Sequence, residues 1–342
     1  YQSVKDQLNR FLEKVAEKGF KDVSIISGKV SSSNKQLMVR LYQLGLIATD
    51  TILLNDTIIK ARVKEGQLLF GLLNDGVLRS TALEAFNQPL LKRIGELNNT
   101  LNCLRWLACM KEASHYIVVN IPSANLILYE KGQPKLESRI VVGKNSTPTP
   151  TLSSKITEVI IYPYWNVPNK IATKELLPLI KKYPAFLDEN NYQVLDKQGA
   201  IVDPATVSWH TLSQAYFPYQ LRQSTGCDNS LGLIKLNFYS PYAVYLHDTP
   251  WKYFFSMNKR YFSHGCMRVE KAFELARYVI RDKPAVIDSL ESQGCLKDQK
   301  PQTIAATEEI PVFVLYQTAW ISMEGRLSFH DDVYNVLTTV KK

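Results

Sequence analysis

The spacing of hydrophobic residues changes near residue 112, and this change constrains the fold more than any other sequence feature. After it, short runs rich in β-branched residues and separated by turn residues predict mostly antiparallel strands. Before it, hydrophobic residues recur at helical spacing in segments at about 3–18, 34–48, 57–73, 80–86 and 89–110. The sequence therefore predicts an α+β protein, with a helical unit at residues 1–111 and a β-rich domain at residues 112–342.

The β-rich part is interrupted between about residues 168 and 225, where a helical pattern and several prolines replace the strand pattern. This stretch predicts an inserted subdomain of helices and loops. A helix is expected at about 269–281, and a last hairpin from 311–321 and the segment after Gly325. The other strands are expected at 115–121, 125–130, 138–143, 156–162, 231–238 and 243–247.

Charge and hydropathy exclude several classes of protein. The net charge is +9, but the basic residues are spread along the chain, without an arginine-rich arm, an RNA-binding aromatic signature or zinc-finger spacing. We therefore expect no nucleic-acid partner. The longest apolar runs are far shorter than the roughly 20 residues that span a bilayer. Because the sequence begins with Tyr1, we expect any signal peptide or anchor to be absent from it.

The chain has an odd number of cysteines and no CxxC pair, which indicates neither a zinc site nor a dense disulfide framework. At least one thiol must therefore remain outside any intramolecular disulfide. The five residues are Cys103, Cys109, Cys227, Cys266 and Cys295.

Cys266 is the cysteine best placed for chemistry. It lies in Ser263-His264-Gly265-Cys266-Met267-Arg268, directly ahead of the helix expected to begin near Val269. A helix N-terminus and the neighbouring Arg268 would both favour the reactive thiolate. Gly265 would let the backbone N–H groups of residues 265 and 266 face an oxyanion. The alternative is a structural cysteine beside a turn.

A nucleophilic thiol needs a general base, and two histidines are candidates. His247 ends an expected strand 19 positions before Cys266, and the intervening loop is long enough to bring the two together. His264 would share a face with Cys266 in an extended segment. Spacing alone does not separate these two residues.

Two motifs in this region resemble a known signature. Y-L-H-D-T-P at residues 245–250, followed by S-H-G-C-M-R at 263–268, resembles that of the L,D-transpeptidases with a YkuD-like catalytic domain, and most closely their large YcbB-like branch. The helical unit, with D-G-V at 75–77 and L-R-W-L at 104–107, looks like the peptidoglycan-binding-like domain of that branch. The resemblance extends to segments at 140–144, 149–150, 162–168, 202–204 and 231–235.

The resemblance implies a YkuD-like β-sandwich in which residues 168–225 form a capping subdomain. It makes Cys266 the nucleophile and His247 its general base, oriented by the backbone carbonyl of Asp248 or a neighbour. Tyr245 and Gly265, with the Cys266 N–H, would line the acyl site. Further residues expected at the substrate are Asp248, Ser263, His264 and Arg268. Cys227 is expected to be an incidental small residue.

The resemblance also implies an activity. An L,D-transpeptidase joins peptidoglycan stems through a cysteine thioester, expels D-Ala from a donor tetrapeptide and passes the acyl group to a side-chain amine. It requires no metal or cofactor, works in the periplasm or cell envelope, and is acylated by carbapenems. Two alternatives remain open: an L,D-carboxypeptidase or cysteine peptidase on the same scaffold, and a noncatalytic wall-binding module.

Overall fold

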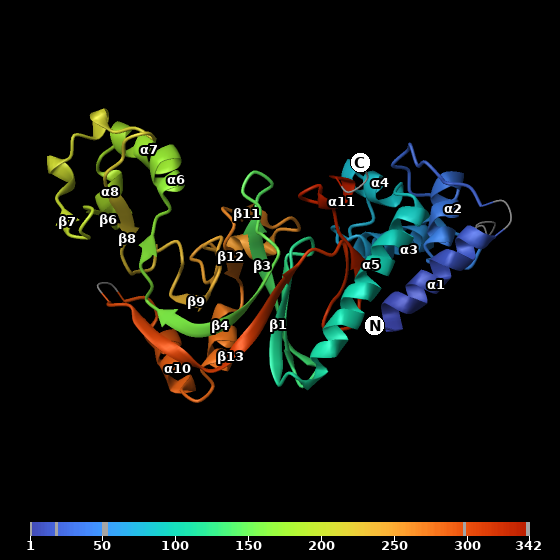
Figure 1. Cartoon of the computed structure of the whole chain (residues 1–342). Coiled ribbons are helices and arrows are strands. Elements are labelled where there is room, and N and C mark those ends of the chain that lie inside the picture. Colours follow the sequence, from blue (N-terminus) through green and yellow to red (C-terminus); the bar gives the residue numbers. More distant parts are fainter. Residues whose placement is uncertain (1, 18–19, 50–53, 297–298, 340–342) are drawn as a thin grey trace. The chain divides into compact units, whose positions relative to one another are not determined.

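A computed structural model describes residues 2–17, 20–49, 54–296 and 299–339 (Figure 1). The chain forms two compact units, and each is assembled from segments that are separated in the sequence. Unit 1 contains the N-terminal helices and the C-terminal end, and unit 2 contains most of the β-rich part. Unit 1 comprises Tyr1–Glu137, Met257–Arg260 and Phe313–Lys342, and unit 2 comprises Ser138–Ser256 and Tyr261–Val312.

Five helices form at the expected places in unit 1. They are α1 Gln2–Ala16, α2 Lys35–Gln43, α3 Asp56–Leu69, α4 Ser80–Phe86 and α5 Leu90–Ala108, followed by the 3₁₀ turn η1 Cys109–Glu112. The Asn55 side chain caps α3 by accepting a hydrogen bond from the Ile58 N–H. Helices α2 and α3 end earlier than predicted because Gly45 and Gly71 adopt positive φ. The end predicted for the first helix, at residues 18–19, lies outside the described residues.

The helices enclose an apolar core that also takes in residues from the end of the chain. Phe11, Phe86 and Phe329 are all buried in it, and Phe70 packs edge-on against Phe86. Unit 1 also contains the hairpin of β1 His115–Asn120 and β2 Asn125–Glu130. The predicted last hairpin forms from β14 Ala319–Ile321 and β15 Leu327–Phe329, and the short helix α11 Val336–Thr339 follows.

Unit 2 is built on a mostly antiparallel sheet. Its strand order is β11-β3-β12-β10-β9-β4-β13. The pairs β11–β3 and β10–β12 are parallel, and β12–β3, β10–β9 and β4–β9 are antiparallel. Helix α9 Ala272–Val279 contacts β4 and β9, and α10 Pro284–Gln293 contacts α9. The strands are β3 Gln133–Gly143, β4 Leu152–Ile161, β9 Ile234–Phe238, β10 Leu246–His247, β11 Tyr261–Ser263, β12 Met267–Val269 and β13 Gln302–Leu315. The α+β class predicted from the sequence is confirmed.

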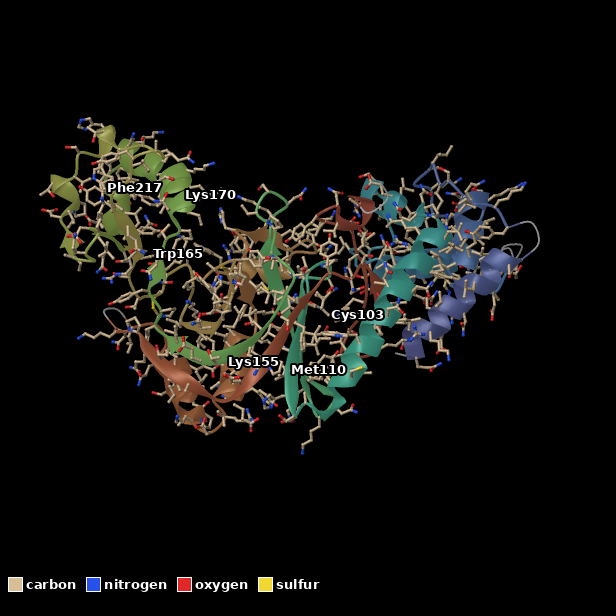
Figure 2. All side chains as sticks on the ribbon, in the orientation of Figure 1. Cys103, Met110, Lys155, Trp165, Lys170 and Phe217 are labelled. Carbon is tan, nitrogen blue, oxygen red and sulfur yellow. A yellow bond between two sulfur atoms is a disulfide. The ribbon has the colours of Figure 1, made fainter. Side chains whose placement is uncertain are left out.

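The segment between β4 and β9 is a subdomain with its own core, which we call the cap. Figure 2 labels Trp165 and Phe217, which pack against that core. The cap contains a four-stranded sheet, in the order β5-β8-β6-β7, that the sequence did not predict. The elements of the cap are β5 Trp165–Asn166, α6 Asn169–Ile171, the π-helical turn η2 Ala172–Leu176, α7 Leu177–Lys182, α8 Phe186–Glu189, β6 Tyr192–Leu195, β7 Ile201–Val202, η3 Pro204–Thr206, η4 Trp209–Thr211 and β8 Gln220–Gln223.

A disulfide joins Cys227, which follows β8 in the cap, to Cys295, which lies two residues beyond the end of α10. The expectation that Cys227 is an incidental small residue is therefore wrong. Its partner lies 68 positions away in the sequence, and local spacing carries no information about such a pairing. Next to the bridge, the Thr225 hydroxyl donates a hydrogen bond to the Gln299 carbonyl. Cys103, Cys109 and Cys266 are free thiols.

Among the described residues, no helix combines the length and the apolar character needed to cross a membrane.

Candidate active site

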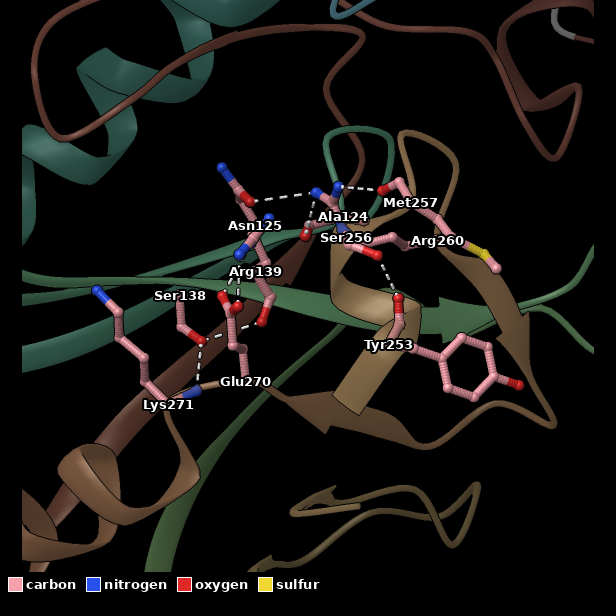
Figure 3. A network of polar contacts seen from close by, with 10 residues as sticks. All are labelled: Ala124, Asn125, Ser138, Arg139, Tyr253, Ser256, Met257, Arg260, Glu270 and Lys271. Atoms are coloured by element: carbon pink, nitrogen blue, oxygen red, sulfur yellow. Dashed lines mark hydrogen bonds and ion pairs between the residues drawn. The ribbon is translucent and has the colours of Figure 1, made fainter. Parts of the chain in front are cut away.

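Cys266 lies between two strands of the sheet, after β11 and directly before β12. The helix expected near Val269 begins only at Ala272, because residues 267–269 pair with β3 and β10 instead. Cys266 is therefore not at a helix N-terminus, and the helix dipole does not activate its thiol. The chain beyond β12 is anchored by the Arg139–Glu270 ion pair and by the Lys271 N–H, which donates to Ser138 (Figure 3).

Strand register places the ionisable side chains of the site on one face. His247 on β10 is opposite Lys235 on β9 and opposite Arg268 on β12. Opposed residues of neighbouring strands point to the same face, and so do residues two apart along one strand. Tyr245 and Cys266, each two positions earlier, therefore join this row, and the Met267 N–H donates to the Tyr245 carbonyl.

The imidazole of His247 is buried, with 4% of its surface exposed, and its orientation is fixed. Its Nδ1 lies 2.5 Å from the backbone carbonyl oxygen of Asp248. A carbonyl only accepts, so Nδ1 carries the proton and Nε2 has the free lone pair of a base. This is the hydrogen bond expected from the resemblance. The ring of Tyr245 lies 5.7 Å from that of His247, in an edge-on arrangement.

Electrostatics keep His247 neutral. Burial lowers its pKa to about 3, and the positive charges of Arg268 and Lys235 act in the same direction. The carbonyls of Asp248 and Leu231 oppose this shift but do not overcome it. At neutral pH the imidazole is therefore ready to accept a proton.

The thiol of Cys266 is half-buried, and its Sγ–H points to the Ala243 carbonyl at 3.8 Å. Burial raises the pKa of this thiol, although hydrogen bonds from Tyr245 and the charges of Lys235 and Arg268 lower it. Sequence alone favoured a thiolate, but burial outweighs the positive neighbours in the resting protein. The resting pair is a neutral thiol and a neutral imidazole.

The loop before Cys266 is held rigidly by hydrogen bonds. The Ser263 hydroxyl accepts from the Gly265 N–H at 3.1 Å and donates to the Cys266 carbonyl. Thr149 donates to the Gly265 carbonyl at 2.8 Å and accepts from the Gly143 N–H. Gly265 adopts φ +118°, which L side chains rarely adopt. The Gly265 N–H, expected to face an oxyanion, is thus already engaged.

Two other residues that were predicted to contact the substrate are buried, and their side chains form hydrogen bonds within the protein. Ser263 has 2% of its surface exposed, and its hydroxyl is used within the loop. Asp248 has 4% exposed, and its carboxylate accepts hydrogen bonds from the Leu233 N–H and Lys252. A Cβ on Gly232 would lie 2.3 Å from this carboxylate, so glycine is required there. These contacts fix the segments that carry the thiol and the imidazole.

His264 is exposed and faces the cap. Its Nε2 lies 2.8 Å from Glu175 Oε1, on the π-helical turn η2, and 3.5 Å from Lys144 Nζ. The ring is thus engaged by groups other than Cys266.

The guanidinium of Arg268 contacts two aromatic rings, and its Cζ lies 5.1 Å from the centroid of Trp251 and 5.2 Å from that of Phe254. Its Nε and Nη1 are buried and have no hydrogen-bond partner among the described residues. Within the same part of the chain, no group of three or more acidic, histidine or cysteine residues could hold a metal ion.

Lys235 and Glu175 are members of this site that the sequence did not predict. One signal for Lys235 was available, since it stands between the apolar residues Ile234 and Leu236 of an expected strand, and a lysine that is partly buried needs a reason. Glu175 gave no such signal, because its contact with His264 spans 89 positions and depends on how the cap folds back.

The family model of the YkuD L,D-transpeptidase catalytic domain matches residues 114–287. A putative L,D-transpeptidase of Haemophilus influenzae is 40% identical over 218 residues, which are 64% of this chain and 44% of that protein. The chain therefore spans less than half the length of this curated relative.

Solved structures with similarity include an L,D-transpeptidase from Mycobacterium smegmatis, at 13% identity and a TM-score of 0.28 over 59% of this chain and 58% of that one. Another is the L,D-transpeptidase LdtMt1 in complex with imipenem, at 13% identity and a TM-score of 0.27 over 59% of each chain. The family match covers the cysteine, the histidine and the strands that hold them, and the chain belongs to the YkuD family of L,D-transpeptidases.

Proposed function

We propose that this protein cross-links peptidoglycan by an L,D-transpeptidase reaction that runs through a thioester on Cys266. One observation carries the proposal. A free thiol, an imidazole whose proton is fixed on Nδ1, and a tyrosine whose ring lies 5.7 Å from that imidazole share one face of the sheet, within the segment that matches the family model. These are the groups that acyl transfer to a cysteine requires.

In the first half-reaction, Cys266 Sγ attacks the carbonyl carbon that follows the L-centre of the diamino acid in a donor tetrapeptide. The thiol proton passes to His247 Nε2 as the C–S bond forms. The oxyanion is held by the Cys266 N–H and the Tyr245 hydroxyl, since the Gly265 N–H is occupied. The C–N bond then breaks, and the imidazolium gives its proton to the departing D-Ala amine.

In the second half-reaction, the side-chain amine of an acceptor stem attacks the thioester. His247 takes the amine proton and returns a proton to the sulfur, so the cross-link forms and the enzyme is regenerated. If water takes the place of the amine, the same site acts as an L,D-carboxypeptidase.

Arg268 is proposed to bind a carboxylate of the donor stem. Its buried Nε and Nη1 lack partners among the described residues, and an arginine pairs with a carboxylate through two parallel hydrogen bonds. The rings of Trp251 and Phe254 both contact the guanidinium, and these cation–π contacts limit its motion. The terminal carboxylate of D-Ala is the charge that such a group would select.

We further propose that the protein acts in the periplasm or cell envelope, with the helices of unit 1 serving as a peptidoglycan-binding-like unit. The disulfide between Cys227 and Cys295 supports this location, because such bonds persist in oxidising compartments. The cap is proposed to cover the bound stem, and its contact with the catalytic loop through Glu175 and His264 supports that role.

Incubation with a disaccharide-tetrapeptide and mass spectrometry of the products tests the proposal. A cross-linked dimer with release of D-Ala is expected. A trimmed monomer would indicate the carboxypeptidase, and unchanged substrate would contradict enzymatic action. The Cys266→Ala variant is the control, since it must yield no dimer. A carbapenem should add its mass to the wild type but not to this variant.

A further inference from the structure

Lys235 is a half-buried charged residue of the catalytic domain. It lies on β9 between Ile234 and Leu236, both fully buried, and its own side chain points to the opposite face. Its register partner on β10 is His247, and its Nζ lies 4.3 Å from the centroid of the Tyr245 ring. No carboxylate forms an ion pair with this ammonium among the described contacts, and the tyrosine ring is its main support.

The electrostatic neighbours of Lys235 are the reacting groups. Burial lowers the pKa of its ammonium, while negative charge on Cys266 and on Glu158 of β4 raises it. The ionisable groups that face the thiol are Tyr245 directly before β10, His247 on β10 and Arg268 on β12, together with Lys235 on β9. Among the described contacts of the two cations, that of Lys235 is with the ring of Tyr245, whose hydroxyl interacts electrostatically with the Cys266 thiol.

We propose that Lys235 is a positioning residue for the transfer reaction, which orients Tyr245 through its ring and stabilises the charge that develops on Cys266. The inference rests on the proposed role of Cys266 as nucleophile. It adds a residue that does not touch the substrate and acts through another side chain.

The position of the charge favours both proton transfers. When the thiol proton moves to His247 Nε2, the ammonium stabilises the sulfur anion that is left. The same charge opposes protonation of the imidazole, so the imidazolium readily passes its proton to the leaving amine. The two effects act in succession. The proton that leaves the thiol is the one that the imidazolium gives to the leaving amine, so no further reactant is needed.

The test measures the reactivity of Cys266 directly. The rate of alkylation by iodoacetamide, a neutral reagent, is followed against pH in a background with Cys103 and Cys109 replaced by serine. Lys235→Gln should slow alkylation at pH 7 by about tenfold and move the midpoint of the profile to higher pH, since removing a nearby positive charge shifts a pKa by about one unit or more. Lys235→Arg should retain most of the rate.

The control is Lys155→Gln, which removes an exposed lysine of β4 that pairs with Glu309 (Figure 2). Iodoacetamide should alkylate Cys266 in this variant at the same rate as in the background protein. Thermal unfolding of each variant reports folding, and Lys235→Leu is the second variant if the glutamine protein does not fold.

A merely structural role would lower the melting temperature without moving the alkylation profile. An unchanged profile in Lys235→Gln, or an equal shift in Lys235→Arg, would overturn the proposal. The alkylation assay does not require peptidoglycan, so the two proposals can fail separately. A shifted alkylation profile in a protein that does not cross-link would support the role of Lys235 and contradict the proposed function. Cross-linking by a protein whose profile does not shift would support the function and contradict the role of Lys235.

Discussion

Removing the disulfide between Cys227 and Cys295 should destabilise unit 2 by an amount that follows from the loop it closes. The two cysteines are 68 positions apart, and the chain-entropy relation gives about 4 kcal/mol for a loop of this length. The loop contains β9 to β12 and α9, and therefore Lys235, His247 and Cys266. Removing the bridge therefore destabilises the catalytic segment, because this segment gains conformational entropy in the unfolded state.

Urea unfolding of the Cys227→Ser/Cys295→Ser double variant measures this loss. Far-UV circular dichroism and intrinsic fluorescence should be followed together, because two units need not unfold in one transition. Dithiothreitol should lower the stability of the wild type to a similar extent and leave the double variant unchanged. The matched control is Cys103→Ser, which removes a free thiol of α5. A loss below about 1 kcal/mol would refute the assignment of loop closure as the source of stability.

Three further outcomes are expected. His247→Ala should slow acylation by a carbapenem at least about 100-fold and His264→Ala by much less, measured by the rate of adduct formation in mass spectrometry; the reverse order would make His264 the base. Thr149→Val, which removes the donor to the buried Gly265 carbonyl, should reduce the free energy of unfolding by about 1–3 kcal/mol in urea titrations, and an unchanged value would show that the bond contributes nothing. Burial lowers the pKa of His247 to about 3 and of His330 to about 4, from an ordinary value of 6.5. The unfolded chain therefore binds protons that the native state does not, and the free energy of unfolding should fall as pH falls from about 6.5 towards 4. The His330→Gln variant should show a smaller fall in unfolding titrations across this range. A fall equal to that of the wild type would contradict the contribution of His330.

The sequence predicted the helices of unit 1 because each repeats its apolar residues over several turns, with local caps such as Asn55. The small sheet of the cap was not predicted, because its strands are too short to show a local pattern. Strands β5 and β7 have two residues each, too few to display alternation, and their pairing with β8 and β6 fixes them. The helix was expected to begin near Val269 for the same reason, since only the pairing of residues 267–269 with β3 and β10 makes them a strand.

Within the site, the sequence identified the residue types but not their surroundings. Cys266 and His247 stood out by their neighbours and by the family signature, and both lie in the same row of the sheet. The activation of the thiol was misjudged because desolvation depends on tertiary packing, which a local pattern does not contain. The disulfide was missed for a related reason, since no rule of spacing joins Cys227 to Cys295.

Burial has opposite effects on the two partners of the proposed reaction, and this explains why the site needs its cations. It raises the pKa of the Cys266 thiol and lowers that of the His247 imidazole, so both changes oppose the ion pair. Lys235 and Arg268 counteract only the rise in the thiol pKa, without overcoming it, because positive charge favours a thiolate and disfavours an imidazolium. In the proposed reaction, negative charge therefore develops on the sulfur mainly as the C–S bond forms, while the thiol proton passes to His247 Nε2. The neutral resting thiol should accordingly react with alkylating reagents more slowly at neutral pH than a free thiolate would.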